Sequence, residues 1–431
     1  MVPGSRGLPH TQVLHGTLDS PFSGVDTRYT HSAVIVYENY CTDVIRKMLA
    51  ALLMLKNEEK SIKTTLHSIR DHVKHVIVFD TGSTDTTLDI IRNMCRRNKQ
   101  ILHLKCGSFH NFAVSRNESI EFAETIASTH PIDFLLLLDA GDEFQCAGSK
   151  RDLTRVLQTI SPAHKFGIVK KKWLEPTGTI EHYDVRCIRV RKGCRYDVRY
   201  PVHETFQGRS VSNMIFLNDV FVLYQNRLLH GESSNGRFEK DIAMLSSAPV
   251  TKRNYYYLGQ TYMNRSDYEN GYKYNLLAFE TKDEDVSISL DAMEDSVILL
   301  RVMNCAIFLK KESSVILDYF QKIVAIKPTN IDAYIYLFKY CVDNDMHECA
   351  KPYIHTLAEL TKPIEGERTL LNHNYYDYLR WHLISTVCLK IGDFVFGKIA
   401  CIKANETAGS VLDKIHLQLF DNNLRALEDK K

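Results

Sequence analysis

Short apolar runs alternate with amphipathic stretches between residues 48 and 138, and this alternation constrains the fold more than any other feature. Apolar runs at 49–55, 76–79, 101–104 and 133–138 have the length of buried strands, and several are rich in branched side chains. The stretches between them repeat apolar residues every three or four positions, which is typical of helices that cover a sheet. This order predicts a largely parallel α/β sheet with both faces covered.

Three polar clusters directly follow these apolar runs. They are Asn57-Glu58-Glu59, Asp80 to Asp85, and Asp139 to Glu143. Ligands of parallel α/β sheets bind beyond the carboxyl ends of the strands, so we expect the three clusters to converge at one edge. Asp85 also precedes the helix expected over 86–97, and helix capping alone is the interpretation that we favour for it.

Further along the chain, the pattern predicts strands over 166–172, 184–190 and 220–224. Two basic runs lie in this part, Lys170-Lys171-Lys172 and Arg189 to Arg195. We interpret most of these cations as a solvated strand edge, and contact with a diphosphate is the alternative.

Helical periodicity dominates from about residue 238 onward. Six residues between Tyr255 and Ala278 fall at the spacing of a tetratricopeptide unit, and the same offsets recur between Tyr334 and Leu357. We therefore expect an all-α, tetratricopeptide-like domain over 238–431, whose surface selects an acceptor or forms a homodimer. Residues 1–47 lack periodicity and are expected to be a disordered N-terminal extension.

Composition limits which partners the chain is expected to bind and in which compartment it is expected to lie. A net charge of +2 over 431 residues does not favour nucleic acid or a charged membrane surface. The apolar run Met48 to Leu55 is far shorter than the roughly 20 residues that span a bilayer, and no signal peptide is visible. The 11 cysteines are scattered without a CxxC pair, so we expect reduced thiols and a cytoplasmic location.

Four motifs occur in the order seen in family 2-like glycosyltransferases of the GT-A fold. They are LMLKNEE at 53–59, VFDTGSTDTT at 78–87, FAVSRN at 112–117 and LLDAGDE at 137–143. The chain resembles the subgroup that appends tetratricopeptide-like helices. The resemblance implies a Rossmann-like GT-A domain, which we place at 48–237. It also implies a nucleotide-diphosphate sugar donor, with UDP-sugars favoured, a protein, peptide or glycan acceptor, and Mn²⁺ or Mg²⁺.

The metal would stabilise the charge that develops on the diphosphate leaving group, and hard cations prefer carboxylate ligands. The family's usual Asp-x-Asp motif stands here as Asp139-Ala140-Gly141-Asp142, with one more residue between the acids. The resemblance implies Asp142 as a metal ligand and Asp139 as a ligand of the ribose or the metal, and Glu143 can replace either. A surface turn after a strand is the alternative for this motif.

The resemblance also assigns residues to the nucleotide. Asp80 resembles the acid that contacts the uridine base, and Asn57 and Glu58 resemble the turn that borders the nucleotide. Arg116 and Asn117 resemble the pair that faces the nucleotide or its diphosphate. A surface ion pair is the alternative for Arg116.

Two later segments resemble the acceptor side and the segment that closes over the diphosphate. Inversion at the anomeric carbon needs a carboxylate base, and Glu204 is the candidate. Its neighbour His203 is a candidate ligand of metal or diphosphate, and a structural His–Glu pair is the alternative. His230 is a candidate metal ligand, with an inert loop position as the alternative, and Arg237 is a candidate diphosphate contact.

Two hypotheses of different classes follow. The first is a glycosyltransferase that is metal-dependent and inverts the anomeric carbon. The second is a catalytically inactive, transferase-like scaffold whose helical repeats bind a peptide or protein, which the altered Asp-x-x-Asp spacing motivates. A dinucleotide-dependent enzyme is not favoured, because no Gly-x-Gly-x-x-Gly motif follows the first strand.

Overall fold

The computed structural model describes residues 48–147, 150–175, 178–226, 234–282, 295–363 and 370–429. The extension expected at 1–47 and the candidate ligand His230 lie outside these residues.

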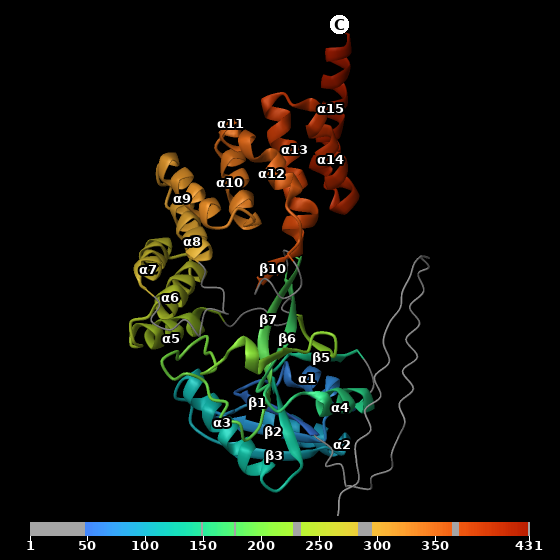
Figure 1. Ribbon diagram of the computed structural model, residues 1–431, viewed down its shortest axis with the longest axis vertical. Coiled ribbons are helices and arrows are strands. Elements are labelled where there is room, and N and C mark those ends of the chain that lie inside the picture. Colours follow the sequence, from blue (N-terminus) through green and yellow to red (C-terminus); the bar gives the residue numbers. More distant parts are fainter. Residues whose placement is uncertain are drawn as a thin grey trace, which may run out of the picture. The chain divides into compact units, whose positions relative to one another are not determined.

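Four parallel strands form one half of the sheet, in the order β3-β2-β1-β4 (Figure 1). They are β1 (Met48–Leu55), β2 (His75–Asp80), β3 (Ile101–Cys106) and β4 (Ile132–Leu138), joined by α1 (Ile62–Ser68), α2 (Thr87–Arg97) and α3 (Phe112–Ala127). These bounds agree closely with the elements expected from the apolar runs. β1 and β2 are almost entirely buried, because helices cover both faces of the sheet here.

Alternate residues of β1 enter two separate cores. Leu53 and Leu55 pack with α1 and α2 on one face. Ala50 and Leu52 pack with α3 on the other face. A continuous apolar run therefore satisfies both faces, as the two-residue period of a strand requires.

The other half of the sheet makes it mixed rather than parallel. β7 pairs antiparallel with β4, and the order continues as β4-β7-β6-β9-β5. The elements of this half are β5 (Glu143–Cys146), α4 (Lys150–Thr159), β6 (Phe166–Glu175), β7 (Gly178–Arg189), a 3₁₀ turn (Val211–Asn213), β8 (Met214–Phe216) and β9 (Phe221–Asn226). The three strands expected beyond residue 165 are present.

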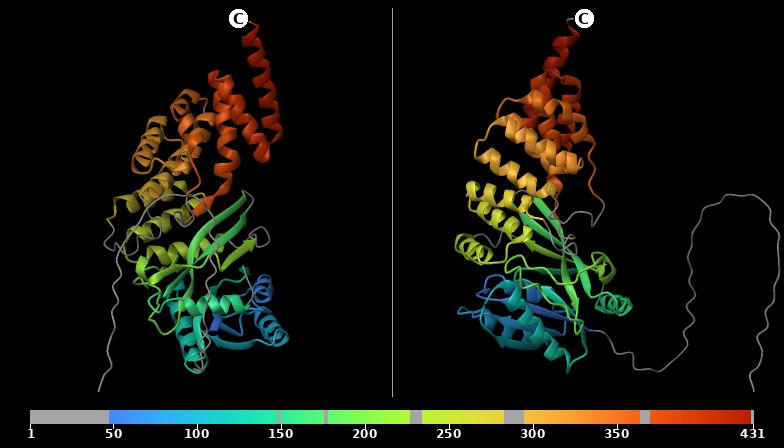
Figure 2. Two further views of the ribbon diagram at one scale, coloured as in Figure 1. Left: turned by 45° about the vertical axis from the view of Figure 1, so that its right-hand side comes forward. Right: turned by 60° about the vertical axis from the view of Figure 1, so that its left-hand side comes forward.

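Helices dominate the described residues from 234 onward, and neighbours along the chain pack side by side, as Figure 2 shows for α6 to α9. The elements are α5 (Ser234–Ser246), α6 (Lys252–Asn264), α7 (Tyr268–Glu280), α8 (Asp295–Phe308), α9 (Ser313–Ile326), α10 (Ile331–Asp343), α11 (His347–Ala350), a 3₁₀ turn (Lys351–Tyr353), α12 (Ile354–Glu359), β10 (Leu370–Asn372), a π-helical turn (Tyr375–Leu379), α13 (Arg380–Ile391), α14 (Phe394–Ala408) and α15 (Val411–Glu428). The short strand β10 is the exception, and it pairs antiparallel with β7.

Glycine permits the close approach of α6 and α7. A Cβ atom on Gly259 would lie 2.6 Å from the Asn275 amide, and one on Gly271 would lie 2.8 Å from Met263. Both glycines belong to the predicted tetratricopeptide spacing, whose register stays a prediction. None of the helices in the described residues is long and apolar enough to cross a membrane.

Candidate active site

The carboxyl ends of β1, β2 and β4 place the three polar clusters along one edge of the sheet. Leu55 pairs with Asp80, and Leu53 pairs with Leu138, the residue before Asp139. Asp80 and Asp139 therefore end strands that flank β1 on either side. At about 4.8 Å per strand, they lie about 10 Å apart at the same edge.

Asp139 accepts charge-assisted hydrogen bonds from three cations on three different elements. Its Oδ1 lies 3.0 Å from Arg116 Nη2 of α3, and its Oδ2 lies 2.9 Å from Arg186 Nη1 of β7. The same Oδ2 lies 3.3 Å from Lys171 Nζ of β6. Burial alone would raise the pKa of Asp139, but Arg186, Lys171 and Arg116 outweigh it and hold the pKa well below its ordinary value.

Arg116 connects Asp139 to the candidate base Glu204. Its Nη2 contacts Asp139 while its Nε forms an ion pair with Glu204, and the Glu204 side chain is 12% exposed. Burial would lower the pKa of Arg116, but the charges of Glu204 and Asp139 raise it. One guanidinium therefore contacts both carboxylates and holds them at a set separation.

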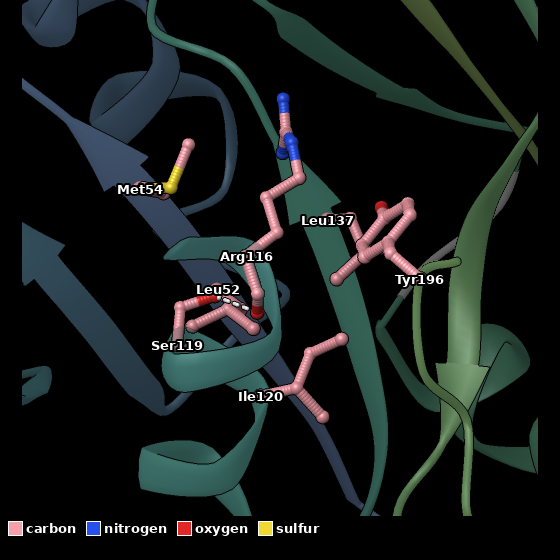
Figure 3. A pocket seen from close by; sticks show the side chains of 7 residues that line it. All are labelled: Leu52, Met54, Arg116, Ser119, Ile120, Leu137 and Tyr196. Carbon is pink, nitrogen blue, oxygen red and sulfur yellow. Dashed lines mark hydrogen bonds between the residues drawn. The ribbon is translucent and has the colours of Figure 1, made fainter. Parts of the chain in front are cut away.

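A small pocket lies beside Arg116, between α3 and the ends of β1 and β4 (Figure 3). Its volume of about 10 Å³ holds one water at most, so it is no sugar site. Arg116 extends along this pocket, and its guanidinium carbon lies 6.0 Å from the centre of the Tyr196 ring.

Asp142 is closed to solvent. Its Oδ1 lies 2.7 Å from Lys171 Nζ, its Oδ2 accepts a hydrogen bond from the Asp139 backbone at 3.0 Å, and its side chain is 0% exposed. Lys171 is equally enclosed, with 2% of its surface exposed. The second acid of the altered motif therefore holds the turn after β4 in shape and neutralises a buried lysine.

The interpretation of the lysine run as a solvated strand edge is wrong for Lys171. Strand alternation directs Lys171 into the acidic cluster, whereas Lys170 and Lys172 approach Glu181, at 3.9 and 3.0 Å. The two-residue period of the strand is the signal that separates the inward lysine from its neighbours.

The described carboxylates do not fit a divalent cation. Both oxygens of Asp139 already face cations within 3.3 Å, so a metal at either oxygen would meet like charge. Asp142 has no exposed surface through which to bind one. Glu143 lies at the start of β5. The metal roles of Asp139, Asp142 and His230 remain predictions.

The predicted nucleotide residues Asp80 and Asn57 join the first two loops to each other. Asp80 is 2% exposed and accepts hydrogen bonds from the backbone of Gly82 and Ser83. Asn57 adopts a positive φ of 55°, and its Oδ1 accepts from Thr84 N at 2.7 Å. These contacts shape the loops that border the edge of the sheet.

Glu58 and Asp85 continue this network. Glu58 N donates to Thr87 Oγ1 at 2.7 Å, and its carboxylate accepts from Ser61. Asp85 accepts from Thr87 N at 3.0 Å, one residue before the assigned N-cap of α2. Burial would raise the pKa of Asp85, but its hydrogen bonds with Thr87 and Glu59 lower it. This placement agrees with the capping interpretation.

Asn117 and His203 contact protein rather than open space. Both polar atoms of the Asn117 amide bond the Tyr196 backbone, at 3.0 and 2.7 Å, and so hold that residue beside Arg116. His203 has a positive φ of 54°, and its ring stacks on Tyr257 of α6 at 4.0 Å.

Arg237 borders a larger groove of about 350 Å³, which has the size of a small-molecule site. The groove is lined by Phe109, Phe112, Gly236, Arg237, Lys240, Asp241 and Met244. Arg237 Nε lies 3.6 Å from Asp241, whose side chain is 7% exposed. Burial raises the pKa of Asp241, the Arg237 charge opposes this, and the Glu204 charge adds to it. Asp241 therefore feels the charge of the candidate base, although Glu204 itself does not line the groove.

Arg186 and Asp241 had no predicted role, and Lys171 was predicted only as part of the basic run 170–172. The signal that could have found Asp241 is its i, i+4 spacing from Arg237 on a helix. Arg186 carried no signal for its contact with Asp139, because that contact depends on how β7 pairs with β4. Its second partner, Asp184, lies two residues away on β7 itself.

Residues 51–145, which span this sheet edge, match the model of the family described as Glycosyl transferase family 2. The chain contains a family 2 glycosyltransferase domain. It is similar to the SPbeta prophage-derived glycosyltransferase SunS of Bacillus subtilis (strain 168), with 29% identity over 140 residues. Glycosyltransferase SunS of Bacillus phage SPbeta matches to the same extent. These matches cover 32% of this chain, and the chain spans only 30% of either relative's length.

Two solved structures are similar at a lower sequence identity. TarS 1–349 of S. aureus in complex with UDP is 14% identical, with a TM-score of 0.29, covering 65% of this chain and 89% of that one. YrrB, a TPR protein with an unusual peptide-binding site, is 14% identical, with a TM-score of 0.31, covering 44% and 87%. Likenesses at these TM-scores carry no weight, and the GT-A-like fold rests on the strand order and the family match.

Proposed function

We propose that this chain moves a sugar from a nucleotide-diphosphate donor, with UDP-sugars favoured, to a protein, peptide or glycan acceptor. The observation that carries the proposal is the guanidinium of Arg116, which joins Asp139 to Glu204 at the carboxyl edge of the family 2 segment. In this proposal residues 48–237 form the transferase domain, and the helices of 238–431 select the acceptor or form a homodimer.

Glu204 acts as the base of an inverting displacement. The acceptor oxygen bonds to the anomeric carbon, its proton passes to Glu204, and the bond to the diphosphate breaks with its electron pair. Arg116 supports this role because it orients the Glu204 carboxylate through an ion pair while contacting Asp139. Asp241 borders the groove and feels the charge of Glu204, and the groove gives an acceptor room to approach.

The donor lies along the sheet edge in this proposal. Asp80, Asn57 and Glu58 border the base and ribose, since their loops are tied together at the ends of β1 and β2. Asp139 contacts the ribose, and Asn117 acts indirectly by holding Tyr196 against Arg116. Arg237 has a 62% exposed side chain, so a change of rotamer that breaks its pair with Asp241 can turn it toward a diphosphate.

Mn²⁺ or Mg²⁺ is what the family resemblance implies, with Asp139, Asp142 and His230 as ligands. The ion pairs of Asp139 and Asp142 do not fit such a cation, so no step of this proposal passes through a metal.

A second candidate function is a transferase-like scaffold without activity. The enclosure of Asp142 with Lys171 favours it, because this acid has no surface with which to contact a donor. The helices would then bind a peptide or protein partner.

A cytoplasmic location belongs to the same proposal. The ten cysteines in the described part of the chain are all free thiols, and most are buried. Such thiols suit a reducing compartment.

One screen separates the two functions. The purified full chain is incubated with a panel of UDP- and GDP-sugars, and hydrolysis and thermal shift are both measured. A transferase should hydrolyse at least one donor of the panel. The rate of hydrolysis should fall in Glu204→Gln, while the thermal shift caused by that donor stays the same. Absence of any nucleotide-dependent thermal shift across the panel contradicts the transferase and favours the scaffold.

A further inference from the structure

Three histidines from three elements meet on the α3 side of the sheet. His75 begins β2, His103 lies within β3, and His130 follows the end of α3. Each ring offers a nitrogen that lies within 4.8 Å of one on both other rings. The strand register explains the pairing: His103 lies opposite Ile77, so it shares a face with His75 two residues away.

The separations suit one small cation. His75 Nδ1 lies 3.0 Å from His103 Nε2, and their ring centres are 5.3 Å apart. The His130 ring meets these rings edge-on, at 4.9 and 5.1 Å. In a tetrahedral zinc site, with Zn–N bonds of about 2.0–2.1 Å, neighbouring ligand nitrogens are about 3.3 Å apart. The nitrogens of the cluster lie within 4.8 Å of one another, so the farthest pair would have to approach by at most about 1.5 Å.

The charge state and surroundings of the rings also suit metal binding. Burial lowers the pKa of His75 to about 4, with further lowering by His103, His130 and Lys74. Burial and His130 lower the pKa of His103. Two of the rings are therefore neutral near pH 7, which ligation requires. His130 Nδ1 lies 3.1 Å from the Ile126 carbonyl, so donation there leaves Nε2 as the free lone pair.

We infer that His75, His103 and His130 form a binding site for a borderline divalent transition-metal ion, with Zn²⁺ as the expected occupant. Three imidazoles and no oxygen ligand select such an ion over Mg²⁺ or Ca²⁺. His103 and His130 are partly exposed, which leaves access for the ion and for a water as fourth ligand.

This site is separate from the candidate active site. His75 and Asp80 stand at opposite ends of β2, and five residues at about 3.3 Å each place them about 16 Å apart. A bound ion would join β2, β3 and the end of α3, the helix that carries Arg116 near its other end. The expected role is structural: the ion anchors α3 against the sheet.

The test uses the full chain, stripped with a chelator and dialysed into metal-free buffer. Titration with ZnCl₂ is followed by calorimetry and thermal shift, and CoCl₂ by visible absorption. We expect one equivalent of Zn²⁺, a raised Tm because the ion binds the native state, and the intense spectrum of tetrahedral Co²⁺. MgCl₂ should leave the Tm unchanged.

Variants then locate the ion. His103→Gln and His130→Gln alter partly exposed rings and should lose both the Zn²⁺-dependent Tm rise and the Co²⁺ spectrum. His67→Gln, at an exposed position of α1, is the matched control and should retain both. Circular dichroism without metal confirms that each variant folds. Absence of stoichiometric Zn²⁺ in the wild type, or equal binding in both variants, overturns the inference and leaves a neutral histidine cluster. Neither outcome bears on sugar transfer.

Discussion

Lys171 and Asp142 form an ion pair that is shut off from solvent, with 2.7 Å between Nζ and Oδ1. Each residue is held by a different half of the mixed sheet: Lys171 by β6 and Asp142 by the turn after β4. Their pairing therefore joins the two halves beside Asp139, whose Oδ2 also lies 3.3 Å from Lys171 Nζ.

Lys171→Met should destabilise the fold strongly. It leaves Asp142 buried without a cation, and removing one partner of a buried pair costs about 3–5 kcal/mol. Denaturant unfolding measures the loss. Lys172→Met is the control, because Lys172 pairs with Glu181 at a 36% exposed position, where about 0–1 kcal/mol is expected. Equal losses of unfolding free energy in the two variants would show that the buried ion pair of Lys171 contributes no more than the exposed pair of Lys172.

Glu204→Gln should lower kcat for sugar transfer by about 10²–10⁴-fold with little change in the KM for the donor, because the amide cannot take the acceptor proton. Initial rates at saturating donor provide the measurement. Glu121→Gln is the matched control, since that carboxylate is 63% exposed and lies 3.8 Å from Arg195. A kcat within the range of the control would exclude Glu204 as the base.

UDP should bind with the same affinity in EDTA and in MnCl₂. The expectation follows from the three cations that already occupy the oxygens of Asp139. Isothermal titration in the two buffers decides the question. A loss of about tenfold or more in EDTA, equal to about 1.4 kcal/mol, would restore Asp139 and Asp142 as metal ligands.

The buried Asp413 should make stability depend on acid pH. Burial would raise its pKa, but hydrogen bonds from Ser410, His382 and Tyr378 lower it from 3.8 to about 2. A lowered folded-state pKa stabilises the protein above the unfolded pKa, here by about 2 kcal/mol at neutral pH. This contribution is lost as the pH falls from about 4 toward 2.

Asp413→Asn provides the measurement for that prediction. The difference in unfolding free energy between wild type and variant should shrink as the pH is lowered from 6 toward 3. A difference that stays constant over this range would show that Asp413 titrates alike in the folded and unfolded chains.

The strands were predictable because a strand that is buried on both faces needs an unbroken run of apolar residues. The run at 49–55 must be apolar throughout, since successive side chains enter different cores. The antiparallel pairing of β7 with β4 was not predictable, because it joins segments about 50 residues apart and depends on which surfaces remain uncovered.

From the sequence alone, Asp80 and Asp139 could be placed at the carboxyl ends of strands of one sheet, and the order of the motifs indicated a family 2-like domain. The partners of these acids depend on how distant segments pack in three dimensions. Lys171, Arg186 and Glu204 come from strands and loops whose side-chain directions depend on register and sheet order. The same holds for His75, His103 and His130, which lie in three separate segments of the sequence and are adjacent in space. Electrostatic and ligand contacts act over a few ångströms between distant segments, so a local pattern cannot encode them.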